Sequence, residues 1–233
     1  IKDDPSKHPH VTPEDLAELN AEASVMKAAQ KSDGTGITFK DFLKTSVLWQ
    51  MVLIWFFFDI TFWGFISWLP SYLMKVRGFS LLQTGVYGSL PFFVGTFGML
   101  LGGYLSDRFK GSRKWLFIPA AMVAAFCLYL TFSVAAAEMA VVAQCVSAFF
   151  MFVAFAAFWG LVVDSIPAEI MGASSGTVNF GGQVAGFVSP FVMGYLIDLN
   201  HGSFDMAFMF LIAGTVASVF VALTVKSSDI ASS

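Results

Sequence analysis

Residues 103–114, GYLSDRFKGSRK, form a basic connector between two long apolar segments, 85–106 and 115–134, and overlap the end of the first. A glycine comes first, then the acid and base Asp107 and Arg108, then three further cations, Lys110, Arg113 and Lys114. Clustered cations beside an apolar segment favour one side of a membrane. In a chain as apolar as this one, the connector therefore orients all the other segments.

The composition indicates that lipid is the solvent. Hydrophobic residues make up 57% of the 233 positions and charged residues only 12%, whereas soluble proteins carry about 25% charged residues. No basic stripe lies on a soluble domain, which argues against a nucleic-acid partner. The histidines and cysteines form no cluster with metal-ligand spacing, so neither a metal nor another cofactor is expected.

Six apolar segments predict six transmembrane helices at about 47–72, 85–106, 115–134, 137–163, 174–197 and 206–225. Each reaches the about 20 residues that a helix needs to cross a bilayer. None alternates in the manner of a transmembrane β-strand. The predicted fold is an all-α integral membrane bundle over 47–225, followed by a short cytoplasmic tail, 226–233.

Residues 1–46 are polar and are expected to precede the membrane domain as a cytoplasmic segment. Residues 12–15, TPED, are typical of a helix start, and the helix is expected to run to about Gln30, before a break at 32–36. Phe39, Phe42 and Leu43 then follow helical spacing, which fits either an amphipathic helix on the membrane surface or a helical linker. The charged start at Ile1 is typical of an internal segment, so we expect a piece of a longer chain.

The cations are distributed unevenly over the predicted topology. Six spans put both termini on one side, together with eleven of the thirteen Lys and Arg residues; only Lys75 and Arg77 fall on the other. The positive-inside rule then places the eleven cations and both termini in the cytoplasm.

Asp59 is the sharpest candidate functional residue because it lies in the middle of the first span. A charged side chain there costs about 2.5–3.5 kcal/mol and usually faces a cavity or a partner. Trp55, Asp59 and Trp63 are spaced by four and share one helix face. Asp59 is expected to line an aqueous path and to take up a proton or contact substrate; a structural Asp bonded to a neighbouring helix is the alternative.

The fifth span begins with an unusually polar, glycine-rich stretch, and it contains the amides Asn179 and Gln183 on one face. These amides suit hydroxyl or carboxylate groups in a cavity, or else hydrogen bonds between helices. Trp159, near the cytoplasmic end of the fourth span, fits either stacking on a ligand or anchoring at the interface. The two GxxxG pairs, Gly98–Gly102 and Gly182–Gly186, predict close helix packing.

The connector itself is a candidate gate. Gly103 and Asp107 are four residues apart, which predicts a close-packing glycine and a carboxylate on one helix face, with Arg108 next to them. Such a carboxylate can cap the positive end of a neighbouring helix and release it when the helices tilt. Four cations after a span are also ordinary orientation signals.

The connector resembles the loop signature of the major facilitator superfamily, roughly G-x-L-[AGS]-D-R-[FY]-G-R-R/K, with Lys110 and Ser112 as two insertions. The matching residues are Gly103, Leu105, Ser106, Asp107, Arg108, Phe109, Gly111, Arg113 and Lys114. Residues 62–85 and 164–198 resemble the seventh helix, and the tenth and eleventh helices, of the anion:cation symporter branch. The opening HPHVTPEDLAEL is similar to the central cytoplasmic loop of that branch.

The resemblance implies the C-terminal half of a twelve-helix transporter, built as two inverted three-helix repeats. Members of the branch carry organic anions such as galactonate, glucarate and hexuronates, usually with protons. It therefore implies these partners: a small organic anion, a proton or other cation, the lipid bilayer and the N-terminal half. It also implies a bacterial inner-membrane location, and it puts Asn179 and Trp159 where the family contacts substrate.

The function predicted from these features is secondary active symport of a sugar-acid-like anion by alternating access. The predicted substrate-binding residues are Asn179, Trp159, Asp59, Trp55 and Gln183, and the predicted cytoplasmic latch is Gly103, Asp107, Arg108 and Arg113. No enzyme is expected, because an intramembrane serine protease needs an activated Ser with a base, and neither a GxSxG motif nor a histidine lies in any span. A stand-alone six-helix membrane channel or scaffold is the alternative.

Overall fold

The computed structural model describes Thr12, residues 16–17, Ala21 and residues 38–225. The chain divides into two units, Ile1–Thr38 and Phe39–Ser233. Apart from the isolated positions above, the predicted helix of 12–30, the break at 32–36 and the tail 226–233 lie outside the described residues. All that follows concerns the second unit.

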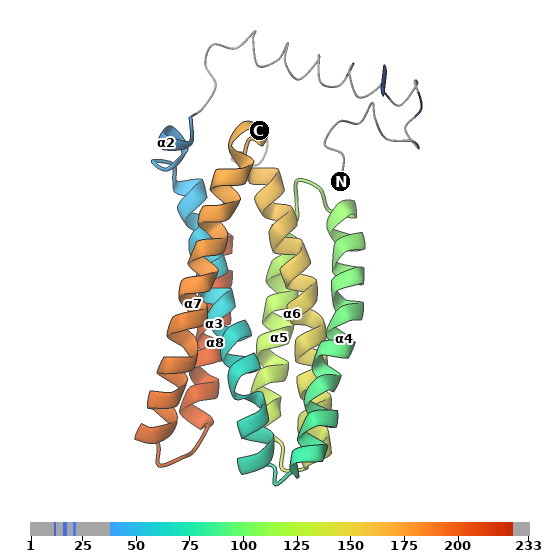
Figure 1. Ribbon diagram of the computed structural model, residues 1–233, viewed down its shortest axis with the longest axis vertical. Coiled ribbons are helices and arrows are strands. Elements are labelled where there is room, and N and C mark those ends of the chain that lie inside the picture. The colour runs from blue at the N-terminus through green and yellow to red at the C-terminus, as the bar shows by residue number, and fades with distance from the viewer. Residues whose placement is uncertain (1–11, 13–15, 18–20, 22–37, 226–233) are drawn as a thin grey trace. The chain divides into compact units, whose positions relative to one another are not determined.

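The described part of this unit is built from helices (Figure 1). In chain order they are α2 (Phe39–Phe42), α3 (Ser46–Lys75), α4 (Leu81–Arg108), α5 (Lys114–Ser133), α6 (Ala137–Ser165), the 3₁₀ turn η2 (Ala168–Ile170), α7 (Met171–Leu199) and α8 (Asp205–Thr224). In this part of the chain six helices are long and apolar enough to cross a membrane. The all-α membrane fold is therefore confirmed, and each predicted span coincides with one helix to within a residue or lies inside it.

The six long helices form two three-helix repeats of opposite direction, α3–α5 and α6–α8. The first helices of the repeats, α3 and α6, begin at opposite ends of the bundle (Figure 1). The packing follows the same relation: α3 packs on α7 and α8, while α6 packs on α4 and α5. The predicted inverted repeats thus cross in two equivalent seams, α3–α7 and α4–α6.

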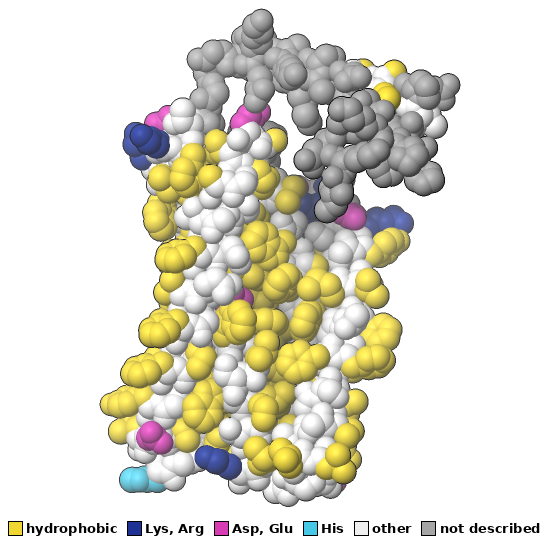
Figure 2. Space-filling model, viewed as in Figure 1, with side chains coloured by type: hydrophobic (Ala, Val, Ile, Leu, Met, Phe, Trp, Pro, Cys, Tyr) yellow, Lys and Arg dark blue, Asp and Glu magenta, His cyan; other side chains and the backbone are white. Residues whose placement is uncertain are grey.

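Charged side chains gather at the two ends of the bundle, and hydrophobic side chains cover the length between them (Figure 2). Two cations, the buried Lys114 and the half-buried Arg77, bind backbone carbonyls at the C-terminal ends of helices. At one end Lys114 donates to the carbonyl of Val225 at 2.6 Å. At the other, Arg77 donates to the carbonyl of Thr131 in the last turn of α5 and to that of Val134, the residue after the helix, at 2.9 Å. Cations stabilise these carbonyls because the C-terminal end of a helix carries partial negative charge.

The apolar side of α2 packs against the bundle. Phe42 is buried in the same cluster as Leu48 and Phe117, and Phe39 and Leu43 pack against that cluster. The indole of Trp49 donates to the carbonyl of Leu43 at 2.8 Å and links this turn to the start of α3. The apolar side chains of this predicted amphipathic segment are therefore covered by contacts with the helix bundle.

Polar side chains hold the central helix α3 to its neighbours. The hydroxyl of Thr61 lies 2.6 Å from the carbonyl oxygen of Leu211 and 2.7 Å from the hydroxyl of Thr215, both on α8. Ser189 on α7 donates to the carbonyl of Ile60 at 2.5 Å. Such bonds contribute about 0.6 kcal/mol each in a membrane, so they fix the register of α3 more than they stabilise the bundle.

Candidate functional site

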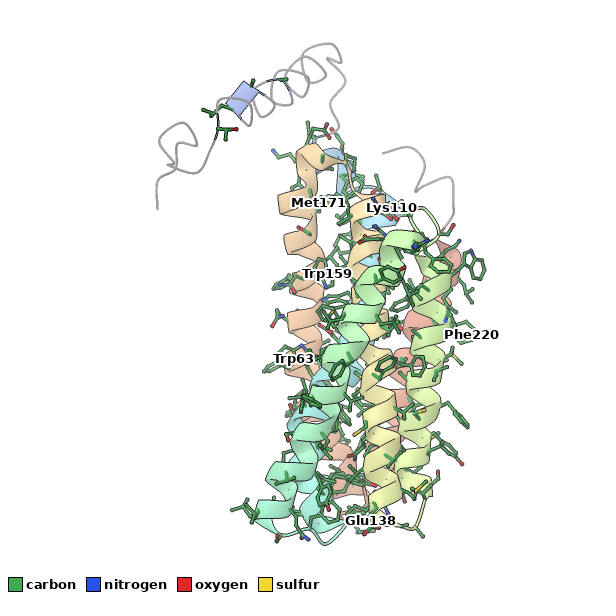
Figure 3. The ribbon with its side chains drawn as sticks, turned by 90° about the vertical axis from the view of Figure 1, so that its right-hand side faces the viewer. Trp63, Lys110, Glu138, Trp159, Met171 and Phe220 are labelled. Carbon is green, nitrogen blue, oxygen red and sulfur yellow. The ribbon has the colours of Figure 1, made fainter. Side chains whose placement is uncertain are left out.

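An open cavity of about 440 Å³ lies between α3, α6 and α7. Its walls combine aromatic faces with small polar groups. The lining residues are Trp55, Phe155, Trp159, Gly172, Ser175, Gly176 and Asn179. Figure 3 shows Trp159 in the half of the bundle nearer the connector residue Lys110, and Trp63 of α3 farther from that connector. A concave, mostly apolar site with a few polar groups is the usual form of a small-molecule site.

Trp55 lines the cavity, and three aromatic rings hold its side chain in place. Its ring is stacked on Phe158, with centroids 4.7 Å apart, and meets Phe155 and Trp159 edge-on at 5.0 and 5.2 Å. Aromatic pairs of this geometry contribute about 0.5–1.5 kcal/mol each. The indole is 3% exposed, so only part of it is presented to the cavity.

The first turns of α7 form the polar wall. The polar stretch that the sequence placed at the start of the span lies within the helix, which begins at Met171 after the 3₁₀ turn. Ser175 and Asn179, four residues apart, line the cavity. Asn179 is exposed. Gln183, one turn further on, is exposed but does not line the cavity. Only one of the two predicted amides, Asn179, therefore belongs to the cavity wall.

Asp59 lies beneath this site rather than in its wall. It is 3% exposed, and its Oδ1 has no hydrogen-bond partner among the described residues. The same is true of the indole nitrogens of Trp55 and Trp63. Gly182 of α7 covers the group, since a Cβ on Gly182 would overlap Asp59 Oδ2 and Trp55 Nε1. The predicted helix face is therefore real, but it is turned into the α3–α7 seam.

The cavity carries no charge of its own. None of its lining residues, all of which belong to the described part of the chain, is a Lys, Arg, Asp or Glu. The polar atoms offered to a ligand are therefore amide and hydroxyl groups. Such groups bind the hydroxyls of a ligand and orient it, while neutralising a full negative charge requires a cation from elsewhere.

At the connector, Arg113 is the centre of a buried network. Its guanidinium donates to Asp164 Oδ1 at 2.9 Å, to the carbonyl of Gly160 at 2.6 Å and to the carbonyl of Ser106 at 3.0 Å. Asp164 also accepts from the backbone N–H of Gly111 at 3.1 Å. One arginine thus joins the ends of α4 and α6 to the connector.

The other predicted latch residues lie outside this network or at its edge. Asp107 is largely exposed and lies 3.7 Å from Arg113; among the described residues it faces this guanidinium, not a helix N-terminus. Arg108 is exposed and donates to the hydroxyl of Tyr104 at 3.0 Å. The prediction that Gly103 packs closely is wrong within this chain, because a Cβ there would meet nothing within 4 Å; its neighbour Gly102 packs on α6 instead.

Phe155 in the cavity and Asp164 in the Arg113 network are among the site residues that were not singled out from the sequence. Phe155 lies in a Phe-rich run in which nothing distinguishes one ring from the next. Asp164 gave a usable signal: the connector 164–172 contains acids and no bases, and it falls on the same predicted side as the basic connector 103–114. Complementary charges on two connectors of one side indicate a contact between them.

Comparisons with known proteins agree with this architecture. Residues 1–190 match the family model of the Major Facilitator Superfamily. The chain is 35% identical to a probable sulfoacetate transporter of Cupriavidus necator, covering 98% of this chain and 55% of that protein. It is 30% identical to a hexuronate transporter of Bacillus subtilis (88% and 49% covered) and 28% identical to a probable galactarate/D-glucarate transporter of Escherichia coli (89% and 49%).

These matches confirm the predicted resemblance to the superfamily and to its sugar-acid-type members. The chain spans about half the length of the curated relatives it matches.

Proposed function

Because this chain belongs to the Major Facilitator Superfamily, we propose that it forms the C-terminal half of a secondary transporter that moves a small organic anion with protons by alternating access. Two unlike halves then rock around a site near the middle of the membrane. The cytoplasmic side is the end with the basic connector, and the membrane is the bacterial inner membrane. Both termini of the chain face the cytoplasm in this arrangement.

The cavity between α3, α6 and α7 is the observation that supports this function. Trp55 and Trp159 offer flat apolar faces, while Asn179 and Ser175 offer hydrogen-bonding groups within one helical turn. A hydroxylated carbon chain matches both features, because its C–H faces stack on indole and its hydroxyls bond to amides. This half therefore binds the hydroxylated or neutral end of the substrate.

The anionic end of the substrate is bound by the other half. The cavity described here has no cation, and a carboxylate or sulfonate taken from water needs one. A site divided in this way is complete only when both halves close on the substrate. The closure of the two halves can then depend on whether substrate is bound.

The Arg113 network serves as the cytoplasmic latch of this half. Arg113 and Asp164 form its fixed part, since both are buried or half-buried and hydrogen-bonded. Asp107 and Arg108 are its exposed part and are free to meet the other half. The latch closes in one state of the cycle and parts in the other.

Exchange transport by the intact native polypeptide in proteoliposomes tests the proposal. The probes are radiolabelled D-glucarate, D-glucuronate, L-galactonate and sulfoacetate, chosen from the chemistry that the relatives' names give. We expect saturable exchange of at least one of them. Exchange of none, by protein that is folded and inserted, contradicts the proposed function.

The site is tested with Asn179→Ala and a matched control, Thr177→Val. Asn179 lines the cavity, and Thr177, two residues away on α7, does not. Loss of one hydrogen bond of about 0.5–1.5 kcal/mol raises KM about 2–10-fold for Asn179→Ala. Equal KM values for the two variants contradict the assignment of Asn179 as a substrate contact.

A further inference from the structure

Asp59 is the one acidic side chain of the described residues that is buried in the middle of a span. It lies 13 residues from the start of α3 at Ser46, which is about 20 Å along the helix axis. The unpartnered atoms of Asp59, Trp55 and Trp63 are all buried and lie on the same helix face. Unsatisfied polar atoms are rare in protein interiors and call for an explanation.

From this arrangement we propose that Asp59 carries the coupled proton, and that the α3–α7 seam controls when it is bound and released. The inference rests on the proposed transport function and names one residue that performs its coupling. The chemistry is the formation and cleavage of a single carboxyl O–H bond. The proton comes from water that reaches the cavity on one side of the membrane and leaves to water on the other.

The packing around Asp59 selects a proton over larger cations. Gly182 packs directly on its carboxyl group, because even a methyl group on Gly182 would overlap Oδ2. A metal ion needs several oxygen ligands, whereas the polar neighbours of Asp59 are two indole N–H donors, and the described residues contain no cluster of three metal-ligand side chains. A proton needs neither volume nor additional ligands.

No other titratable group faces Asp59 among the described residues, and the indole N–H of Trp63 is near enough to interact with its carboxyl group. The titratable and charged side chains of the helices packed against α3 lie elsewhere along them. They are Tyr195 and Asp198 on α7, Asp205 on α8, Glu138, Cys145 and Asp164 on α6, and Tyr87, Tyr104, Asp107 and Arg108 on α4. Protonation of Asp59 is therefore governed by its access to water.

Trp55 links the proton to the substrate. Trp55 lines the cavity. A Cβ added to Gly182 would overlap both Trp55 Nε1 and Asp59 Oδ2, so these two atoms lie against the same part of α7. With the seam closed, Gly182 covers the carboxyl group of Asp59. When the seam opens at Trp55, water and the indole N–H groups can stabilise the carboxylate. Trp55 and Gly182 are positioning residues for this step.

The test compares two modes of transport by the intact polypeptide in proteoliposomes, with radiolabelled D-glucarate, D-glucuronate, L-galactonate and sulfoacetate as probes. Exchange at equal pH needs no net proton movement, whereas uphill accumulation driven by a pH gradient does. We expect Asp59→Asn to lower accumulation at least tenfold while exchange stays within about threefold. The control Asp198→Asn makes the same chemical change at an exposed position of α7 and should leave accumulation unchanged.

The outcomes separate this inference from the function on which it rests. If the unaltered protein exchanges no probe, the proposed function fails, and this inference fails with it. If Asp59→Asn accumulates substrate as the unaltered protein does, transport stands and the role of Asp59 is overturned.

A second readout needs no transport. Intrinsic tryptophan fluorescence of the purified protein is titrated with acid, because Trp55 and Trp63 flank Asp59. We expect a transition that Asp59→Asn abolishes and Asp198→Asn retains, in protein that stays monodisperse. The same transition in all three proteins, or none in the unaltered protein, overturns the proposal.

Discussion

The two seams in which the inverted repeats cross are equivalent in topology but differ in what fills them. In the α4–α6 seam two glycines meet backbone: a Cβ on Gly98 would lie 2.9 Å from the carbonyl carbon of Phe149, and one on Gly102 would lie 2.8 Å from the Cα of Val153. Gly95, in the same seam, meets the ring of Phe152. In the α3–α7 seam Gly181 meets both the side chain and the backbone of Val52, whereas Gly182 and Gly186 meet side chains. There Gly182 covers Asp59 and Trp55, and Gly186 lies against Trp63.

The difference separates a rigid contact from a movable one. Backbone packed on backbone yields only if a whole helix moves, whereas an indole can rotate or shift. The α4–α6 seam is also tied at its connector end by Arg113, which bonds to carbonyls of both helices. The α3–α7 seam adjoins the cavity and contains the unpartnered polar atoms. In the proposed transporter, one repeat crossing serves as the frame, and the other adjoins the substrate site.

The largest effect is expected from removing the tie. Arg113→Ala leaves the half-buried Asp164 without its guanidinium partner, and breaking a buried pair costs about 3–5 kcal/mol. The apparent melting temperature of the detergent-purified protein should fall by about 10 °C. Arg108→Ala, which removes a surface cation bonded to Tyr104, is the control and should lower it by less than about 2 °C. Similar shifts for both would contradict the assignment of Arg113 as the tie.

Gly98→Ala tests whether the α4–α6 seam is rigid. Its Cβ would press on the backbone of Phe149, and overpacking of this kind costs about 1–3 kcal/mol. We expect thermal unfolding to begin several degrees lower. The matched control is Gly103→Ala on the same helix, where a Cβ meets open space, and its melting curve should overlay that of the unaltered protein. A tolerated Gly98→Ala would mean that α4 and α6 separate easily.

Gly182→Ala makes the same change in the α3–α7 seam, with the opposite balance of effects. The added methyl group meets the side chains of Asp59 and Trp55, which can shift at a cost below that of moving a backbone. We expect a smaller loss of stability than for Gly98→Ala but about a tenfold loss of transport rate. Gly85→Ala, at an uncrowded position of α4, is the control for both measurements. A variant that loses stability and keeps its transport rate would reverse the comparison.

The smallest effect on stability is expected for Asp107→Asn. Asp107 is largely exposed and lies 3.7 Å from Arg113, and exposed pairs contribute about 0–1 kcal/mol. The variant should melt almost as the unaltered protein does. Its proposed role predicts slower cycling, seen as a reduced maximal exchange rate with little change in KM. A raised KM at an unchanged maximal rate would contradict a latch.

The fold was predictable because its determinants are local. A span is an uninterrupted apolar segment of sufficient length, so the sequence placed all six helices close to their observed bounds. The uneven distribution of the cations supported this number of spans. Local spacing also grouped Trp55, Asp59 and Trp63 on one face, which the structure keeps together in the α3–α7 seam.

The sites were less predictable because they depend on which way a face turns and on contacts distant in sequence. Gly102 and Gly103 differ by about 100° around the helix, and spacing alone did not decide which of them packs on α6. Gln183 shares a face with Asn179 yet lies beyond the cavity. Asp164 and Arg113 are 51 residues apart in sequence, so their contact appears only once α4, α5 and α6 are assembled.

The central claim is that substrate binds in the cavity that adjoins the α3–α7 seam and not at the α4–α6 seam. Ser175→Cys lines the cavity, and Thr96→Cys lies exposed on α4; each is labelled with a thiol reagent in the intact polypeptide, in a background without other cysteines. The claim predicts that the transported acid slows labelling of Ser175→Cys several-fold and leaves that of Thr96→Cys unchanged. No protection at Ser175→Cys by an acid that the same protein transports, or equal protection at both positions, would contradict it.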